Sequence, residues 1–402
     1  MSGPAATLDL EAIGFAEGAH VLLRRALGHL RPGARLGVRG TDPALTVDLA
    51  AWCRARGHRV DCPDSAPDEP VRAWVTCGHA ESDRWVGAER AGNAGPTQLA
   101  DAPPAHWGLA ARGALIEAGG PGAPYDLGQK ERVWADIAPM LYAQAAAAQW
   151  DPATAVPWGT EVELPAEIES AVVQVMTYLV ENEQAALVLP ARFLARIHPH
   201  FREVLQLLAV QAADEARHIE VFTRRATLAG NMLGTSSAGG RLSLFTLLGE
   251  PDFSLASFLL SVLGEGSFLS LLAFLDRYAP DPVTRTVARL ARHDEARHVA
   301  FGVAHLEHQS AMDPGLRGRL RAAVEHRHDA LVATAGLNED VFDALVVLAA
   351  GSWEPRAIAA GSQAVRQLEE DMYVGRVRRL VRLGFPADEA AELSALHTRN
   401  FM

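Results

Sequence analysis

The sequence predicts a mainly α protein, in which a long helical bundle follows a small N-terminal α/β unit. From Leu127 onward, apolar residues recur every three or four positions, and prolines or glycines separate the segments. Before about residue 80, short apolar runs alternate with amphipathic segments and tight turns. The chain has 402 residues, 49% of them hydrophobic and 21% charged, so two or three domains of ordinary globular composition are expected.

Residues 1–80 are expected to form a compact unit in the order strand, helix, strand, helix and two short strands. The turn at Pro32-Gly33 separates the first helix from the second strand. Asp42-Pro43 begins the second helix, because a capping residue before proline is typical of a helix start, and Gly57 ends it. The segment therefore has a pattern of its own, distinct from the rest of the chain.

The stretch LRPGARLGVRGTDPALTVDLAAWCRARGHRV resembles the TusA-type sulfur-carrier fold, over about 70 residues. That family carries sulfur on the cysteine of a Cys-Pro-x-Pro motif at the start of the first helix, where this chain has Ala16-Glu17-Gly18-Ala19. Because that cysteine is absent, the resemblance implies a docking or structural module. Cys53 lies on the second predicted helix, where a thiol is more often buried and inert than reactive.

Residues 81–128 are rich in Gly, Pro and Ala, which is the composition of a connector. We do not expect a free linker, because large aromatic side chains favour burial. Five tryptophans lie in this stretch or just beyond it: Trp85, Trp107, Trp134, Trp150 and Trp158. The connector is therefore expected to wrap the helical domain, which we assign to residues 129–402.

Charge and cysteine content limit the classes of function. The formal net charge of −12 argues against a general affinity for nucleic acid or anionic membranes. The cysteines are Cys53, Cys62 and Cys77, and their odd number and spacing predict no disulfide framework. No signal peptide pattern is visible at the N-terminus, so we expect a cytoplasmic protein.

The apolar segment Phe253 to Leu275 is long enough to cross a bilayer, but Gly264-Glu265-Gly266 lies at its centre. We therefore expect no membrane span. A basic stretch also occurs near the C-terminus, and a solvated helix face is the favoured interpretation over a docking site for an acidic carrier or a phosphate. It comprises Arg376, Arg378, Arg379 and Arg382.

The pentapeptide Asp-Glu-Ala-Arg-His occurs twice, at 214–218 and at 294–298. Each copy contains Glu-x-x-His, and residues three apart share one face of a helix, so the carboxylate and the imidazole can bind one metal ion together. The short motif is common by chance. Glu17-x-x-His20 and Glu325-x-x-His328 also fit, and we interpret both as incidental.

Two further glutamates make the duplicated motif informative, since a di-metal bundle takes one more Glu from each of two other helices. Glu183 precedes Glu215 by 32 residues and Glu265 precedes Glu295 by 30, which fits one antiparallel helical hairpin each. Glu181 competes with Glu183, and we prefer Glu183 because it continues the apolar face of its helix.

Glu265 lies among roughly twenty apolar residues, where an ionised carboxylate costs several kcal/mol unless it is paired or bound to a cation. A metal ion would compensate that charge. The alternative is a buried ion pair with an arginine.

The order E…DExRH…E…DExRH resembles the ferritin-like di-iron carboxylate superfamily, and over about residues 176–305 it is similar to the hydroxylase subunits of bacterial multicomponent monooxygenases. The resemblance implies a ferritin-like helical bundle with two iron ions. One ion would be bound by Glu183, Glu215 and His218, and the other by Glu265, Glu295 and His298, with Glu215 and Glu295 bridging. It further implies that Asp214 and Asp294 accept hydrogen bonds from these histidines, and that Arg217 and Arg297 anchor the network.

Two departures from relatives narrow the expected chemistry. Ribonucleotide reductase small subunits have a radical tyrosine where this chain has Phe222, and multicomponent monooxygenases often have a threonine where it has Leu269. Side chains one turn from the ligands are expected to line a pocket, although plain core packing fits them equally well. These are Leu179, Ala186, Leu187, Phe222, Phe268 and Leu269.

We therefore expect an O2-dependent di-iron oxidase or oxygenase that acts on a small organic molecule by hydroxylation, N-oxygenation or a related oxidation. Oxygen-rich ligands suit two Fe ions, with Mn or a mixed Fe/Mn pair as alternatives. The expected partners are the substrate, an electron-donor protein and a carrier or docking partner at the N-terminal module, and a homodimer is left open. The alternative functions are a ferroxidase or iron-handling protein and a non-catalytic helical interaction protein.

Overall fold

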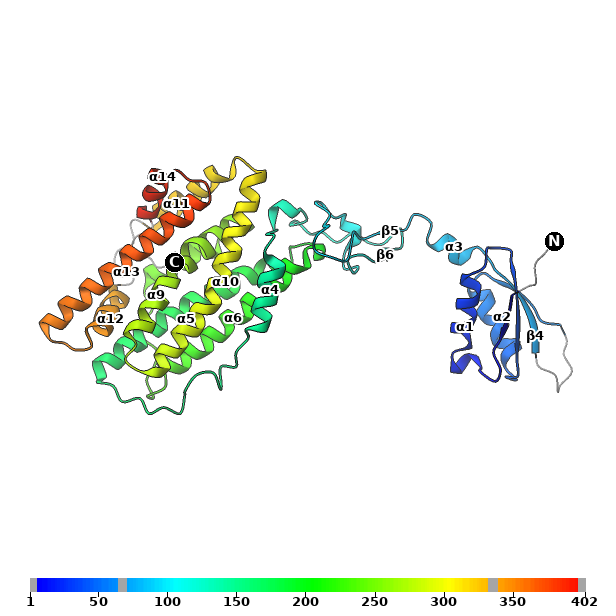
Figure 1. Cartoon of the computed structure of the whole chain (residues 1–402), viewed down its shortest axis with the longest axis horizontal. Coiled ribbons are helices and arrows are strands. Elements are labelled where there is room, and N and C mark those ends of the chain that lie inside the picture. The colour runs from blue at the N-terminus through cyan, green and yellow to red at the C-terminus, as the bar shows by residue number, and fades with distance from the viewer. Residues whose placement is uncertain (1–5, 64–70, 332–338, 397–402) are drawn as a thin grey trace. The chain divides into compact units, whose positions relative to one another are not determined.

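The computed structural model describes residues 6–63, 71–331 and 339–396. It divides the chain into two compact units. The first combines the residues up to Ala91 with Gly113–Pro121, and the second combines Gly92–Arg112 with the residues from Gly122 onward. Figure 1 shows the sheet in the first unit and the long helices in the second. The domain boundaries expected from the sequence, at 80/81 and 128/129, stay predictions.

The first unit is a small α/β fold. Its sheet has the strand order β1-β2-β4-β3, in which β1 is parallel to β2 and β4 is antiparallel to both β2 and β3. The elements are β1 (Ala6–Asp9), α1 (Ala19–Gly28), β2 (Arg35–Gly40), α2 (Leu45–Ala55), β3 (Arg59–Asp61), β4 (Val71–Thr76), α3 (Ala80–Arg84), β5 (Glu89–Arg90) and β6 (Leu115–Ile116). The element order confirms the predicted α/β pattern, while the TusA resemblance stays a prediction.

The core of this unit is formed by buried side chains of α1 and α2 and of strands β2 and β4. Leu23 and Leu49 are fully buried, as are Leu36 and Val75 on neighbouring strands. Cys53 packs into the same core, and burial raises the pKa of its thiol to about 11. Because of this raised pKa, the thiol of Cys53 is protonated and poorly reactive at neutral pH. None of the three cysteines forms a disulfide.

The second unit is a helical bundle, which confirms the predicted fold class. Its helices are α4 (Ala138–Ala147), α5 (Ala166–Leu194), α6 (Arg202–Ala226), α7 (Ala238–Leu248), α8 (Phe253–Ser257), the π-helical segment η5 (Phe258–Glu265), α9 (Gly266–Tyr278), α10 (Pro282–Met312), α11 (Leu316–Leu331), α12 (Glu339–Ala350), α13 (Pro355–Arg382) and α14 (Ala387–Leu396). In the described part of this unit, single 3-10 turns precede α4 at Ala105–Trp107 and Lys130–Arg132, and another joins α5 to α6 at Pro199–Phe201.

Two helical hairpins form the centre of the bundle. Helix α5 packs along α6, and η5 with α9 packs along α10, while α6 also contacts α10 (Figure 1). Asp281 begins α10 as its cap, since its carboxylate accepts the Thr284 N–H at 2.8 Å and Pro282 occupies the first helical position. The hairpins bring the centres of four helices together, as the 32- and 30-residue spacings predict.

The apolar stretch Phe253–Tyr278 is a central helix of this bundle. By length and composition it could cross a membrane, but 83% of its most apolar window is buried within the protein. Its side chains pack against the neighbouring helices rather than facing outward. The high hydropathy is therefore accounted for by its central position.

The segment Gly92–Arg112 belongs to the helical unit and is held there by polar contacts. Arg112 pairs with the buried Glu203 of α6 at 2.9 Å, and the His200 ring accepts the Ala100 N–H at 3.0 Å. Of the five tryptophans, Trp134 is 2% exposed, whereas Trp85, in the first unit, is 43% exposed. Burial of the connector aromatics is thus uneven.

Candidate metal centre

The six predicted ligands meet in the middle of the bundle. Glu183 lies on α5 and Glu265 ends η5, while the two Glu-x-x-His pairs lie on α6 and α10. Their ligand atoms form two groups in which all atoms lie within 4.8 Å of one another: Glu183, Glu215, His218 and Glu295, and then Glu215, Glu265, Glu295 and His298. All six are at most 2% exposed. Glu181 is only half-buried and is in neither group.

The two histidines turn one ring nitrogen toward the glutamates. His218 Nδ1 lies 3.1 Å from Glu215 and 3.5 Å from Glu295, and His298 Nδ1 lies 3.0 Å from Glu215 and 3.3 Å from Glu295. Each Nδ1 therefore faces the same small space as the carboxylate oxygens. In each group, the imidazole and the neighbouring carboxylates are close enough to bind the same metal ion.

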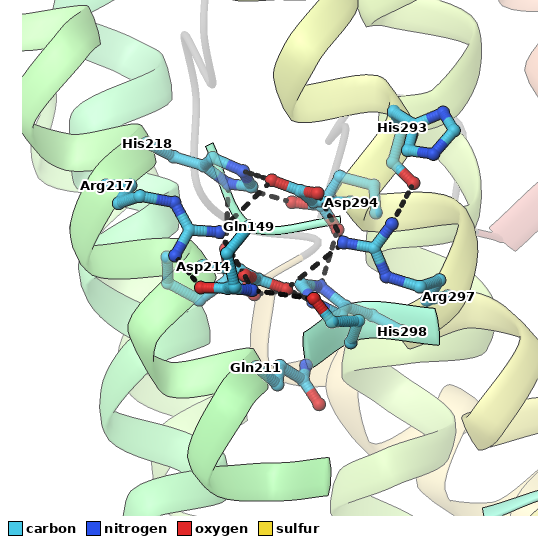
Figure 2. Close-up of polar contacts among 12 residues, drawn as sticks. Gln149, Gln211, Asp214, Arg217, His218, His293, Asp294, Arg297 and His298 are labelled. Atoms are coloured by element: carbon cyan, nitrogen blue, oxygen red, sulfur yellow. Dashed lines mark hydrogen bonds and ion pairs between the residues drawn. The ribbon is translucent and has the colours of Figure 1, made fainter. Parts of the chain in front are cut away.

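The other ring nitrogen of each histidine faces an aspartate of the opposite repeat. His218 Nε2 lies 3.2 Å from Asp294, and His298 Nε2 lies 3.2 Å from Asp214 (Figure 2). A carboxylate can only accept, so Nε2 carries a proton, and Nδ1 is the nitrogen that could bind a metal ion after losing its own proton. The sequence resemblance implies that these aspartates accept hydrogen bonds from the histidines. It does not predict that each aspartate pairs with the histidine of the other helix, α6 with α10.

Two arginines complete this network by bonding to the aspartates (Figure 2). Arg217 donates to Asp214, and Arg297 donates to Asp294, each three residues earlier on the same helix. Each guanidinium also approaches the opposite aspartate, at 3.6 Å for Arg217 and 3.5 Å for Arg297. Both aspartates therefore have a cationic partner and a histidine donor, which keeps them ionised.

Four residues of the site were not predicted. Trp150 Nε1 donates to Asp294 at 2.7 Å, and Gln149 donates to Asp214 at 3.1 Å. Gln211 donates to Glu265 at 3.0 Å, and the nearby Ser261 side chain acts to lower the pKa of that carboxyl, against the larger effect of burial. Gln211 and Ser261 have a signal in the sequence, because each lies four residues, or about one helical turn, before a predicted ligand, Glu215 or Glu265. The contacts of Gln149 and Trp150 depend on how the helices pack and have no such signal.

The cluster carries more negative charge than its neighbours compensate. One oxygen in each of the four glutamates is buried without a hydrogen-bond partner in the described part of the chain: Glu183 Oε1, Glu215 Oε1, Glu265 Oε2 and Glu295 Oε1. Burial and the neighbouring carboxylates raise the pKa of Glu183 and Glu265 well above the usual value. A bound cation would satisfy these oxygens and remove the repulsion.

The histidines respond to the same excess charge. Burial by itself lowers the pKa of an imidazole, but Glu183 raises that of His218 and Glu215 raises that of His298, so both pKa values lie well above the usual one. In the metal-free protein, protons on the imidazoles thus take the place of a cation. Metal binding at this site would displace those protons.

The predicted pocket residues lie in the bundle core. Leu179, Ala186, Phe222 and Phe268 are buried, and Leu187 and Leu269 are half-buried. The Phe222 ring lies 6.1 Å from the ring of His218. Their role as a substrate pocket stays a prediction, as does the ligand role of the six central residues.

A small crevice with a mainly apolar lining lies beside the site at Gln211, with room for about one water molecule. Its polar lining includes Gln211 and Ser261, the two residues that contact Glu265. The other lining residues are Leu189, Pro190, Phe193, Leu208, Phe253, Ala256, Ser257, Leu260 and Phe301. None of the six predicted pocket residues lines it.

No protein-family model matches the chain, and no curated protein matches it in sequence. Among solved structures, the chain is similar to an R2-like ligand-binding oxidase from Sulfolobus acidocaldarius. The two sequences are 16% identical, the match covers 60% of this chain and 91% of that one, and the TM-score is 0.42. The assignment of fold class rests on the bundle itself, in which two Glu and two Glu-x-x-His pairs point inward, as in ferritin-like carboxylate proteins.

Proposed function

We propose that this chain is a di-metal oxidase or oxygenase that uses O2 to oxidise a small organic molecule. The main support is that the two four-residue groups of ligand atoms share Glu215 and Glu295. Two shared carboxylates between two single Glu-His pairs are what a pair of bridged metal ions needs. A structural site for a single metal ion would need only one of the two groups of ligands.

The residues present fit two iron or manganese ions. Glu183 and His218 would hold one ion, Glu265 and His298 the other, and Glu215 and Glu295 would bridge them. Four carboxylates and two imidazoles are hard and intermediate ligands, which favour Fe or Mn over Cu(I) or a thiolate-bound metal. When bound, such ions supply the redox chemistry toward dioxygen.

The protein's own contribution is to orient the ligands and exclude water. Asp214 and Asp294 fix the ring orientation of the histidines, and Gln211 holds one oxygen of Glu265. Because the six residues are almost completely buried, the protein would exclude bulk water from metal ions bound there. An organic substrate needs more room than the crevice offers, so we infer that its binding rearranges side chains near Gln211 and Ser261.

The test is anaerobic loading with Fe²⁺ followed by exposure to O2, with the bound iron and the O2 consumed both measured. We expect two Fe²⁺ per chain and rapid O2 consumption in the native protein. Glu265→Gln is expected to lose one iron and to slow O2 consumption by at least about 100-fold, because it removes a ligand. Glu181→Gln is the matched control on α5 and should behave like the native chain.

A native chain that binds no Fe²⁺, or a Glu265→Gln variant that loads and reacts normally, would contradict the proposal. Sustained turnover of excess Fe²⁺ without an organic substrate or reductant would instead identify a ferroxidase. The oxidase function requires an electron donor, and we propose a separate donor protein for this role.

A further inference from the structure

The helix that carries Glu265 changes its hydrogen-bond pattern just before that residue. Over Phe258–Glu265 the backbone is π-helical, and α9 continues from Gly266. The Gly266 N–H is directed to the carbonyl oxygens of Ser261, Leu263 and Gly264. It is not directed to Val262, four residues back, which would be its partner in an α-helix. The Val262 carbonyl therefore lacks the bond that a regular helix would give it.

A side chain from another helix bonds to that carbonyl. Arg379 of α13 donates its Nε–H to Val262 O at 2.6 Å. Its guanidinium lies directly over Gly266, where a Cβ atom would overlap the guanidinium carbon. Glycine next to Glu265 is thus what allows the arginine to reach the carbonyl.

A second arginine supports the same segment from the same helix. Arg376 donates to the Ser267 hydroxyl at 3.2 Å, and Ser267 in turn donates to the Leu263 carbonyl at 2.7 Å. Arg376 is only 3% exposed, so the solvated face favoured for this basic stretch is wrong at this position. Helix α13 thereby bonds to the Val262 carbonyl directly and to the Leu263 carbonyl through the Ser267 hydroxyl.

These arginines are not part of buried ion pairs. Within the described residues, neither Arg376 nor Arg379 forms a salt bridge with a carboxylate, and burial lowers the pKa of each to about 10. Burying a guanidinium without an acidic partner is costly. The backbone oxygen of Val262 is the acceptor that Arg379 does have, which points to a role in holding this turn.

We propose that Arg379 is a positioning residue for Glu265: by supplying the donor that Val262 lacks, it fixes the π-helical turn that aims Glu265 at Glu295 and His298. A one-residue change of helical register turns a side chain by about 100° around the axis. Return of the segment to α-helix would therefore carry Glu265 out of the cluster. The functional part of this inference rests on the proposed metal site.

The test compares Arg379→Met with Arg378→Met, an exposed neighbour on α13. Crystal structures of the metal-free variants report the helix register, and Mn²⁺ titration followed by electron paramagnetic resonance reports the two binding events. We expect Arg379→Met to lose the π-helical turn and to weaken one Mn²⁺ site by about 10- to 100-fold, leaving the other unchanged. Arg378→Met should match the native protein in both measurements.

A second variant keeps the test decisive if Arg379→Met does not fold. Gly266→Ala keeps the arginine but should displace its guanidinium from the Val262 carbonyl and weaken the same Mn²⁺ site. Equal weakening of both sites would overturn the proposal by showing a general structural role, as would an unchanged π-helical turn in Arg379→Met. If the native chain bound no Mn²⁺, the proposed function would fail, and the crystal structures would still decide what Arg379 does to the turn.

Discussion

His305 is a buried side chain that makes the free energy of unfolding depend on pH. The ring is fully buried on α10, with Nδ1 3.0 Å from the Trp134 carbonyl and Nε2 2.9 Å from the Ser254 hydroxyl. The carbonyl can only accept, so Nδ1 carries the proton and Nε2 accepts from the serine. Burial lowers the pKa of His305 to about 4, which keeps the ring neutral.

This neutral histidine predicts a loss of stability in mild acid. In the unfolded chain its pKa returns to about 6.5, so between about pH 6.5 and 4 the unfolded state binds more protons and the free energy of unfolding falls as the pH falls. From about pH 7 to pH 5 the group contributes a loss of about 2 kcal/mol. Urea unfolding at both pH values should show a smaller loss in His305→Gln than in the native chain.

The exposed His293→Gln variant is the control for this measurement, and it should retain the native pH dependence. An identical pH dependence in His305→Gln and the native protein would show that the buried ring does not titrate as described.

At the scale of helices, one buried arginine joins three of them. Arg225 of α6 is completely buried and bonds to Glu169 of α5 at 2.8 Å and to Asp281, the cap of α10, at 2.9 Å. Its Nε–H also donates to Thr284 at 2.7 Å. The arginine thus compensates two carboxylates at one end of the bundle.

Arg225→Met should therefore destabilise the bundle strongly, because it leaves both carboxylates buried without a cation. We expect a loss of about 3 to 5 kcal/mol in the free energy of unfolding, measured with urea. Arg289→Met, at an exposed position on α10, should change it by less than about 0.5 kcal/mol. A loss below about 1 kcal/mol for Arg225→Met would mean that the pairing contributes little net stability.

The arrangement of elements also explains which features the sequence predicts. Periodicity gives the long helices, and the spacing of Glu183 from Glu215 gives the hairpin, because both depend on local geometry alone. The π-helical turn before Glu265 has no local signal, since it depends on Arg379, more than a hundred residues later. The contact of Trp150 with Asp294 is likewise set by tertiary packing, as Trp150 follows the end of α4.

At the scale of the whole molecule, the chain consists of two units with separate hydrophobic cores. Among the described residues, the core of the helical unit contains none from the N-terminal sheet. The TusA-like resemblance and the docking role that it implies for residues 1–80 stay predictions. Because the Cys-Pro-x-Pro cysteine is absent, the unit has no sulfur-carrying residue whose surroundings could test the resemblance.

Separate cores predict that the helical unit survives without the N-terminal one. A chain that begins at Gly92 should keep its helical content in circular dichroism and its Mn²⁺ stoichiometry, since all six central residues lie in the retained unit. An unfolded or aggregated product would show that the bundle depends on the first unit.

The most direct test of the account is anomalous diffraction at the iron edge, on crystals loaded anaerobically with Fe²⁺. The account predicts two adjacent iron peaks, one beside Glu183 and His218 and one beside Glu265 and His298, with Glu215 and Glu295 between them. Glu265→Gln crystals should retain only the first peak. No iron in the native cluster, or a single ion held without Glu265, would contradict the di-metal assignment.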